Sequence, residues 1–151
     1  MLDNTDRRLL KALQQNATLT AQELGEKLNL SASQAGRRRQ RLEAAGYLIG
    51  ARAVIDPARV GLGVQAFVQV QMAAHSDDTD ASFARLVRAQ ESITAAFTLT
   101  GEADYLLRVW CADLQALHEI IHGILLPHPS VARVQSQIVM DQMKPDAPLP
   151  I

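Results

Sequence analysis

The sequence predicts an α+β protein in two parts: an N-terminal winged-type helix-turn-helix, followed by a C-terminal ferredoxin-like βαββαβ sandwich that dimerises. The first part is indicated by two helix-start signals of the capping-box type, at residues 20–23 and 31–34, and by four arginines in the helix that follows the second signal. The second part is indicated by alternating apolar and polar residues from residue 64 onward, interrupted by two stretches of helical periodicity.

Length and composition are those of a globular protein. A chain of 151 residues, 48% of them hydrophobic, is enough for one mid-sized domain or two small ones with a buried core. The single cysteine excludes an internal disulfide and a cysteine-based structural zinc site. No apolar run reaches the ~18 residues of a membrane span, and the first residues lack the apolar core of a secretory signal. We therefore expect a cytoplasmic protein.

The net charge of −1 conceals an asymmetry between the two parts. Residues 1–59 carry ten Lys/Arg and six Asp/Glu, whereas residues 60–151 carry five and ten. A basic first part and an acidic second part predict a nucleic-acid-binding module joined to one that does not contact nucleic acid. The alternative is an uneven scatter of surface charge, which the clustering of arginines on one helix disfavours.

Three short helices are expected in the first part. Asp3 or Asn4 can cap the first helix, and the capping boxes at residues 20–23 and 31–34 begin the second and third. Leucines at helical spacing give the first two helices a buried face: Leu9, Leu10, Leu13, Leu24 and Leu28. Two helices joined by a tight turn, the second one basic, form the motif that enters a DNA major groove.

The third helix has an apolar side and a basic side. At about 100° per residue, Ala35 and Leu42 lie on one side and most of the arginines lie opposite. Arg can pair with guanine edges and Gln with adenine edges, and both can hold phosphates. The residues expected to contact double-stranded operator DNA are Ser31, Ser33, Gln34, Arg37, Arg38, Gln40 and Arg41. Arg38 sits on the flank, where it contacts phosphate or an acidic neighbour; the alternative for the whole run is a solvated helix face.

Gly46 is a signal for the end of the third helix. Residues 47–49 and 51–55 flank Gly50 as two short extended segments, which predict a small hairpin or a linking strand before Pro57. The expected domains are residues 1–50, the helix-turn-helix; residues 51–62, the linking strand and linker; and residues 63–151, the ferredoxin-like domain for effector binding and oligomerisation.

The second part follows the order strand, helix, strand, strand, helix, strand. The four expected strands are residues 64–72, 93–100, 105–111 and 131–140. One expected helix carries Phe83 and Val87, and the other is capped by Asp113. This order is the ferredoxin-like arrangement, with both helices on one face of an antiparallel sheet. The other face must be covered, and a second copy of the chain in a symmetric dimer is the simplest cover.

These features together resemble the Lrp/AsnC (feast/famine) family of transcription factors. The resemblance covers essentially the whole chain and rests on residues 2–10, 30–48, 100–109 and 131–140 with Lys144. It implies a helix-turn-helix that binds operator DNA, and a C-terminal sandwich that dimerises and assembles into octamers or similar rings. It also implies a small-molecule effector, usually an amino acid, and no cofactor.

The resemblance also carries over an effector site. The family's effector loop falls on Thr100, Gly101, Glu102, Ala103 and Asp104, and a small hydroxyl residue of the last strand, often part of the pocket, falls on Ser136. Ala103 stands where the family often has an aromatic residue, so the pocket differs from the leucine-binding type. Arg39 stands where the family usually has a core-facing Ile or Val, and must therefore snorkel or find a partner.

One motif points to a different class of protein. His118-Glu119-x-x-His122 matches the zinc-protease signature, in which two histidines one turn apart bind metal and the Glu acts as base. His128 falls where the longer form of the motif has a third ligand, but Leu125 replaces the Gly that this form needs to turn the chain. The histidines also project on the polar side of their helix. A zinc metalloprotease-like enzyme is one alternative and adventitious metal binding at the helix surface is another, but we expect no catalysis and no metal site.

Overall fold

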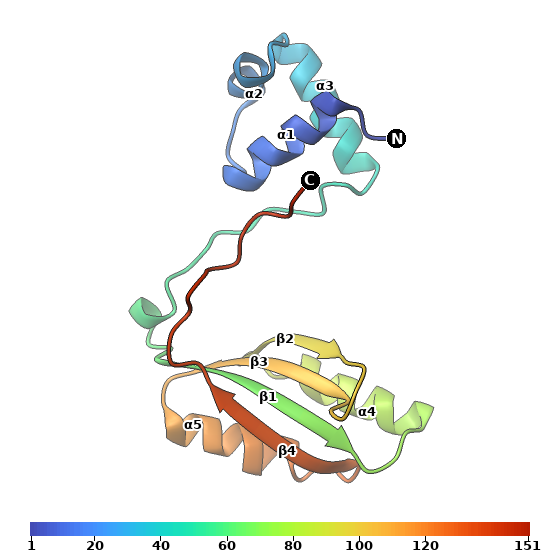
Figure 1. The fold of residues 1–151 in the computed structure, drawn as a ribbon, viewed down its shortest axis with the longest axis vertical. Coiled ribbons are helices and arrows are strands. Elements are labelled where there is room, and N and C mark those ends of the chain that lie inside the picture. The colour runs from blue at the N-terminus through green and yellow to red at the C-terminus, as the bar shows by residue number, and fades with distance from the viewer. The chain divides into compact units, whose positions relative to one another are not determined.

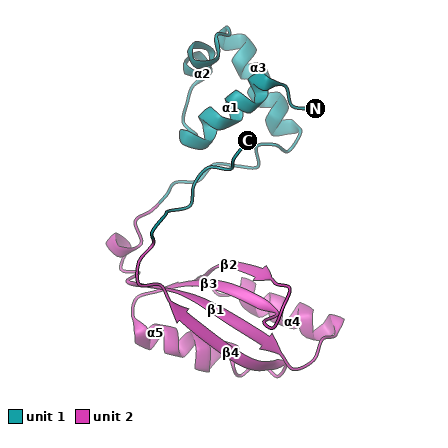
Figure 2. Ribbon diagram, viewed as in Figure 1, with its two compact units in different colours: residues 1–54, 143–151 teal, residues 55–142 magenta.

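The computed structural model describes residues 1–151, which group by their contacts into two units (Figure 2). The first unit comprises residues 1–54 and 143–151, and the second comprises residues 55–142. The last nine residues therefore group with the helix-turn-helix rather than with the ferredoxin-like domain in which we expected them. The reason is local, because the Gln14 side chain bonds both the N–H (2.6 Å) and the carbonyl oxygen (3.2 Å) of Leu149.

The first unit contains three helices: α1 (Asn4–Gln15), α2 (Ala21–Leu28) and α3 (Ala32–Ala44) (Figure 1). Each helix begins at a complete capping box, with Asp3, Thr20 and Ser31 as the N-cap residues. The helix starts expected from the sequence are thus confirmed. The leucine stripes of α1 and α2 meet Ala35 and Leu42 of α3 in a small core, which includes Leu9, Leu24 and Leu28.

The turn from α2 to α3 depends on two residues with special backbone requirements. Asn29 ends α2 in the left-handed conformation (φ 57°), which Asn tolerates better than most residues. Gly25 lies where a Cβ would be 2.7 Å from the carbonyl oxygen of Leu30. Leu30 in turn donates its N–H to the carbonyl oxygen of Gly25, at 2.9 Å. The absence of a side chain at Gly25 therefore lets α2 lie directly against the start of α3.

The expected wing or linking strand is not formed. Residues 48–56 adopt neither helix nor strand, and Ile49, Val54 and Ile55 are exposed. An extended segment becomes a strand only when its N–H and C=O groups pair with a neighbour, and this segment has no sheet partner within the chain. A single 3-10 turn, η1 (Ala58–Val60), precedes the second unit.

The second unit is a four-stranded antiparallel sheet with helices on one face (Figure 1). Its elements are β1 (Val64–Met72), α4 (Asp77–Arg88), β2 (Ile93–Thr98), β3 (Tyr105–Cys111), α5 (Leu114–Glu119), the π-helix η2 (Ile120–Leu125) and β4 (Val131–Ile138). The strand order β2-β3-β1-β4 is that of the expected ferredoxin-like fold. The bounds of β1 and β3 are those expected, while β2 and β4 each end two residues early.

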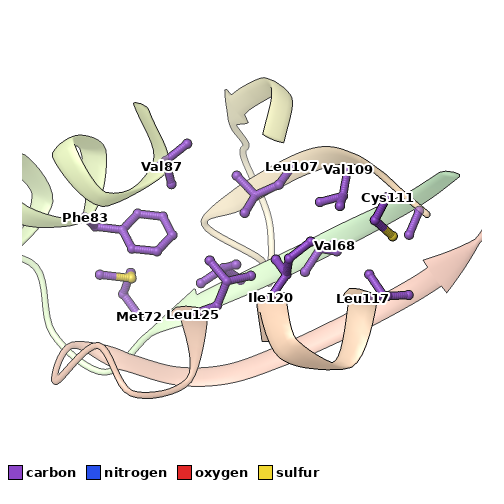
Figure 3. Packing of buried hydrophobic residues seen from close by; sticks show 12 residues of the cluster. Val68, Met72, Phe83, Val87, Leu107, Val109, Cys111, Leu117, Ile120 and Leu125 are labelled. Atoms are coloured by element: carbon purple, nitrogen blue, oxygen red, sulfur yellow. The ribbon is translucent and has the colours of Figure 1, made fainter. Parts of the chain in front are cut away.

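The core of this unit lies between the sheet and its helices (Figure 3). Alternate residues of β1 are buried, as the sequence pattern predicts, and pack with Phe83 and Val87 of α4 and Leu117 of α5. The opposite face of the sheet, here called the open face, carries no helix. It presents polar residues together with apolar ones, and the large apolar ones are Phe67, Phe97, Leu106 and Trp110.

Candidate nucleic-acid interface and effector site

Among the polar side chains on the solvent face of α3, three neither cap the helix nor bind to α1. Ser33, Arg37 and Gln40 are exposed and lie at the spacing of successive helical turns. The Arg37 guanidinium donates a hydrogen bond to Ser33 Oγ at 3.1 Å, which is the only contact that orders it within the chain. These three side chains are therefore free to meet a ligand without breaking a core interaction.

The other two arginines that we expected on this face are bound to α1. Asp6 is only 1% exposed, and Arg41 Nη2 lies 2.6 Å from both of its carboxylate oxygens. Arg38 Nη1 donates to Asp6 at 2.8 Å and to Asp3 at 2.6 Å. The hydrogen bond from Arg38 holds the pKa of Asp3 below its usual value, and the bonds to Asp3 and Asp6 raise the pKa of Arg38. The acidic neighbour expected for Arg38 is thus present, whereas the pairing of Arg41 was not expected.

The remaining two predicted DNA contacts belong to the start of α3. Ser31 Oγ accepts the N–H of Gln34 at 3.2 Å, and Gln34 Oε1 accepts the N–H of Ser31 at 2.9 Å. Both side chains are exposed, but both are used to cap the helix. The structure therefore divides the seven predicted residues into three that neither cap the helix nor bind to α1, a pair bound to Asp6 and a capping pair.

Arg39 is accommodated at the edge of the small core. Its Nε donates to Glu43 at 2.9 Å, and its Nη1 donates to the carbonyl oxygen of Leu19 at 3.1 Å. The arginine that replaces a core-facing aliphatic residue therefore both pairs and reaches outward, as the sequence predicts.

The loop after β2 borders a small hollow on the open face. Gly101 has a φ of 117°, which favours glycine, and the N–H of Leu99 bonds the carbonyl oxygen of Asp104 at 2.8 Å to close the loop. The hollow has a volume of about 50 Å³ and is lined by Gln69, Gln71, Glu102, Ala103, Arg133 and Gln135. Glu102 and Arg133 face each other across it at 3.8 Å. It thus holds one carboxylate, one guanidinium and three amides.

Asp104 does not line this hollow. Its carboxylate accepts the N–H of Met72 at 2.7 Å and meets His75 Nε2 at 3.0 Å. His75 Nδ1 lies 3.2 Å from Asp80, and the bonds to Asp80 and Asp104 raise the pKa of His75 above its ordinary value. Asp104, which the resemblance places in the effector loop, therefore anchors that loop to the end of β1.

Ser136 is also not brought to the hollow. It pairs with Val68 in the β1–β4 register, so it projects toward the helix-covered side, whereas Gln135 and Arg133 pair with Gln69 and Gln71 on the open face. Sequence reasoning named Glu102 and Ala103 but missed the four lining residues of β1 and β4. The sequence signal for these residues is the set of polar side chains that alternate with apolar ones in β1. These polar side chains mark the open face, and the β1–β4 register then identifies the residues of β4 that lie beside them.

Only two of the three histidines of the longer zinc-protease motif lie together, since the His118 and His122 rings are neighbours and His128 is apart from them. His118 and His122 are exposed, whereas His128 is buried. His128 Nε2 is hydrogen-bonded to Ser82 at 3.0 Å, its Nδ1 accepts the N–H of Ser130, and its ring packs edge-on against Phe83. His128 is therefore part of the core and cannot serve as the third ligand of the longer motif.

Comparison with known proteins decides the family. The AsnC-type helix-turn-helix domain matches residues 2–43, and the Lrp/AsnC ligand binding domain matches residues 65–149. The chain belongs to the Lrp/AsnC family. It is 38% identical over 151 residues to the DNA-binding transcriptional activator DecR of Escherichia coli, an alignment that covers 100% of this chain and 99% of DecR. It is 32% identical to the glutamate uptake regulatory protein of Zymomonas mobilis, over 99% of this chain and 91% of that protein.

Solved structures of Lrp/AsnC proteins have the same fold. A transcriptional regulator from Neisseria meningitidis, solved as a complex with L-Met, is 38% identical and superposes with a TM-score of 0.95 over 99% of this chain and 97% of its own. This Lrp/AsnC chain is thus a DNA-binding transcriptional regulator, with α2 and α3 as its helix-turn-helix and an effector-responsive ligand-binding domain. No helix in it is both long and apolar enough to cross a membrane.

Proposed function

We propose that α3 is the recognition helix and that it reads operator DNA with Ser33, Arg37 and Gln40. The observation that carries this is the division on α3 itself: these three exposed side chains make no ion pair, whereas Arg38 and the equally exposed Arg41 are bound to Asp6 of α1. Arg and Gln suit guanine and adenine edges in the major groove, and a Ser hydroxyl suits either a base or a phosphate. The anchored pair contacts phosphates at the flank of the groove.

The variant Arg37→Ala tests this assignment, with Arg85→Ala as the matched control because Arg85 is an exposed arginine of α4. DNA is selected from a pool of random-sequence duplexes, and its binding is measured by fluorescence anisotropy over a series of salt concentrations. If Arg37 contacts a base, its loss costs about 1–3 kcal/mol; if it contacts a phosphate, the salt slope falls by about one. Arg85→Ala leaves both quantities unchanged. If Arg37→Ala binds DNA with the affinity and the salt slope of wild type, the assignment of α3 to the DNA interface is wrong.

We also propose that the hollow on the open face binds the backbone of an amino acid. The Arg133 guanidinium suits a ligand carboxylate, the Glu102 carboxylate suits a ligand ammonium group, and the two charges stand 3.8 Å apart. The three Gln amides can donate or accept further hydrogen bonds. The complex of the Neisseria meningitidis regulator with L-Met supports an amino acid as the effector class. A thermal-shift screen of the twenty amino acids identifies the ligand, because binding to the folded state alone raises its stability.

A homodimer formed through the open face is the assembly that we propose, with octamers as its further stage. On a single chain the hollow, with a volume of about 50 Å³, is far smaller than the roughly 300–1,000 Å³ of a typical ligand pocket. A second sheet packed on the open face would deepen the hollow and would cover the exposed apolar side chains.

We further propose that the chain acts by regulation and not by catalysis. The double role of DNA binding and effector sensing uses no residue of the zinc-protease motif.

A further inference from the structure

Two exposed histidines stand side by side on the outer surface of the second unit. His118 belongs to α5 and His122 to the π-helix η2 that continues it. Their ring centroids are 4.3 Å apart and their planes are inclined by 30°. Neither ring takes part in a hydrogen bond or an ion pair within the chain. The pair is therefore not explained by packing or by internal hydrogen bonding.

The position of the helix on the core determines where the side chains of His118 and His122 point. Leu117 and Ile120, on either side of His118, are buried in the core under the sheet (Figure 3). Residues four apart share one face of a helix, so His118 and His122 both project away from that core. The change from α-helix to π-helix falls between them, after Glu119, and such π segments occur frequently at functional sites.

We infer that His118 and His122 form a two-nitrogen chelate for a transition-metal ion. A neutral imidazole offers one nitrogen lone pair, and two imidazoles this close can direct theirs at a single ion. Imidazole ligands suit Cu²⁺, Ni²⁺ and Zn²⁺, with Cu²⁺ bound most tightly in the Irving–Williams order, whereas Mg²⁺ and Ca²⁺ prefer oxygen ligands. Both rings must be neutral to bind, so the affinity falls toward acidic pH.

This site differs from that of a zinc protease. Glu119 Oε1 accepts a hydrogen bond from Gln115 at 3.4 Å, and His128 is held in the core by Ser82 and Ser130. No group of three or more metal-ligating side chains is present in the chain. The bound ion therefore has two protein ligands, and water or an external ligand fills its remaining positions. The effector hollow uses none of these residues, so the chelate stands whether or not the proposed effector site is correct.

The test measures Cu²⁺ binding by isothermal titration calorimetry with the full chain, purified without a histidine tag. The variants are His118→Ala and His122→Ala, and the matched control is His75→Ala, an exposed histidine held between two carboxylates. We expect one Cu²⁺ per chain. Each variant of the pair should lose affinity by at least about tenfold, because even second-shell changes at metal sites cost 10–100-fold. The control should bind like wild type.

Electron paramagnetic resonance of the Cu²⁺-loaded wild type gives an independent measurement. Coupling to two nitrogens is expected, reduced to one nitrogen in either single variant. The chelate is excluded if His118→Ala and His122→Ala bind Cu²⁺ as tightly as wild type, or if only His75→Ala loses affinity. Circular dichroism checks the fold of each variant, which we expect to be kept because both side chains are exposed.

Discussion

His75 joins two segments of the second unit through both of its ring nitrogens. Asp80, in the first turn of α4, lies 3.2 Å from Nδ1, and Asp104, at the end of the loop after β2, lies 3.0 Å from Nε2. The other titratable group at this site is Tyr105, whose hydroxyl donates to Asp80 at 3.3 Å. Both nitrogens can donate only when the ring is protonated, which is why the two carboxylates raise the pKa of His75.

The sign of the resulting pH dependence follows from this raised pKa. A group whose pKa is higher in the folded state contributes its stability fully below its unfolded pKa, here 6.5, and loses it as the pH rises through the folded value. The melting temperature of wild type should therefore exceed that of His75→Gln most at about pH 5.5, with the difference shrinking toward about pH 8.5. If the difference in melting temperature between wild type and His75→Gln is the same at every pH, the charge of His75 does not contribute to stability.

The four arginines of α3 illustrate how far the sequence determines a site at the residue scale. Helix geometry alone places Arg39 near the core and predicts its need for a partner, which the structure confirms with Glu43 and Leu19. The same geometry places Arg41 on the DNA side, where the structure has it bound to Asp6. That contact depends on how α1 crosses α3, and periodicity within one helix carries no information on a crossing.

At the element scale, two glycines of the first unit have opposite roles. A Cβ at Gly25 would lie 2.7 Å from the backbone oxygen of Leu30, closer than real Cβ contacts, and backbone cannot rotate away as a side chain does. A Cβ at Gly36, within α3, would meet the Cβ of Ala21 at 3.6 Å, an ordinary contact. The first glycine is required by the turn between α2 and α3, whereas the second only weakens a helix.

The substitutions Gly25→Ala and Gly36→Ala should therefore change stability in opposite directions. Gly25→Ala should lower the free energy of unfolding by about 1–3 kcal/mol, the usual cost of overpacking. Gly36→Ala should raise it by up to about 1 kcal/mol, the difference in helix propensity. Urea unfolding followed by circular dichroism measures both, with the midpoint and slope fitted together. Destabilisation by Gly36→Ala, or none by Gly25→Ala, would contradict this account of the turn.

The elements themselves are largely predictable because each has a local signal. The helix starts are fixed by capping boxes and the strands of the second unit by alternation, and both are confirmed. The linking strand at residues 51–55 has a similar extended pattern but forms no strand. Strand formation needs a hydrogen-bonding neighbour, and a pattern cannot state whether one exists. The helix expected after Asp113 is present, but it continues as a π-helix from Ile120, a change that the apolar spacing of the sequence does not predict.

At the scale of the whole molecule, the open face is the surface through which we propose that two chains dimerise. Leu106 lies at its centre on β3, between Phe97 on β2 and Gln69 on β1. Large apolar side chains concentrated on one sheet face are typical of a surface that packs on another protein, and a symmetric dimer covers the same patch twice. The proposed dimer also brings two effector hollows under one interface.

The substitution Leu106→Arg should disrupt this dimer, because each copy would place an unpaired charge in the interface. Leu114→Arg is the matched control, since Leu114 is 60% exposed at the start of α5, on the other side of the sheet. Light scattering coupled to gel filtration should find wild type and Leu114→Arg as dimers or larger, and Leu106→Arg as a smaller species. If Leu106→Arg has the same mass in solution as wild type, the open face is not the dimer interface.

The two proposed sites are linked if an amino acid bound beside Arg133 changes the affinity of α3 for DNA. A ligand at one site typically changes the affinity at a coupled second site by about 5–150-fold. It can do so only if it binds two conformations of the protein with different affinities. The direct measurement is the anisotropy of DNA binding with and without the amino acid found in the thermal-shift screen, for wild type and for Arg133→Ala. We expect the amino acid to shift the DNA affinity of wild type and not that of Arg133→Ala, with the effector-free affinities of the two proteins equal. A full shift in Arg133→Ala would contradict this expectation.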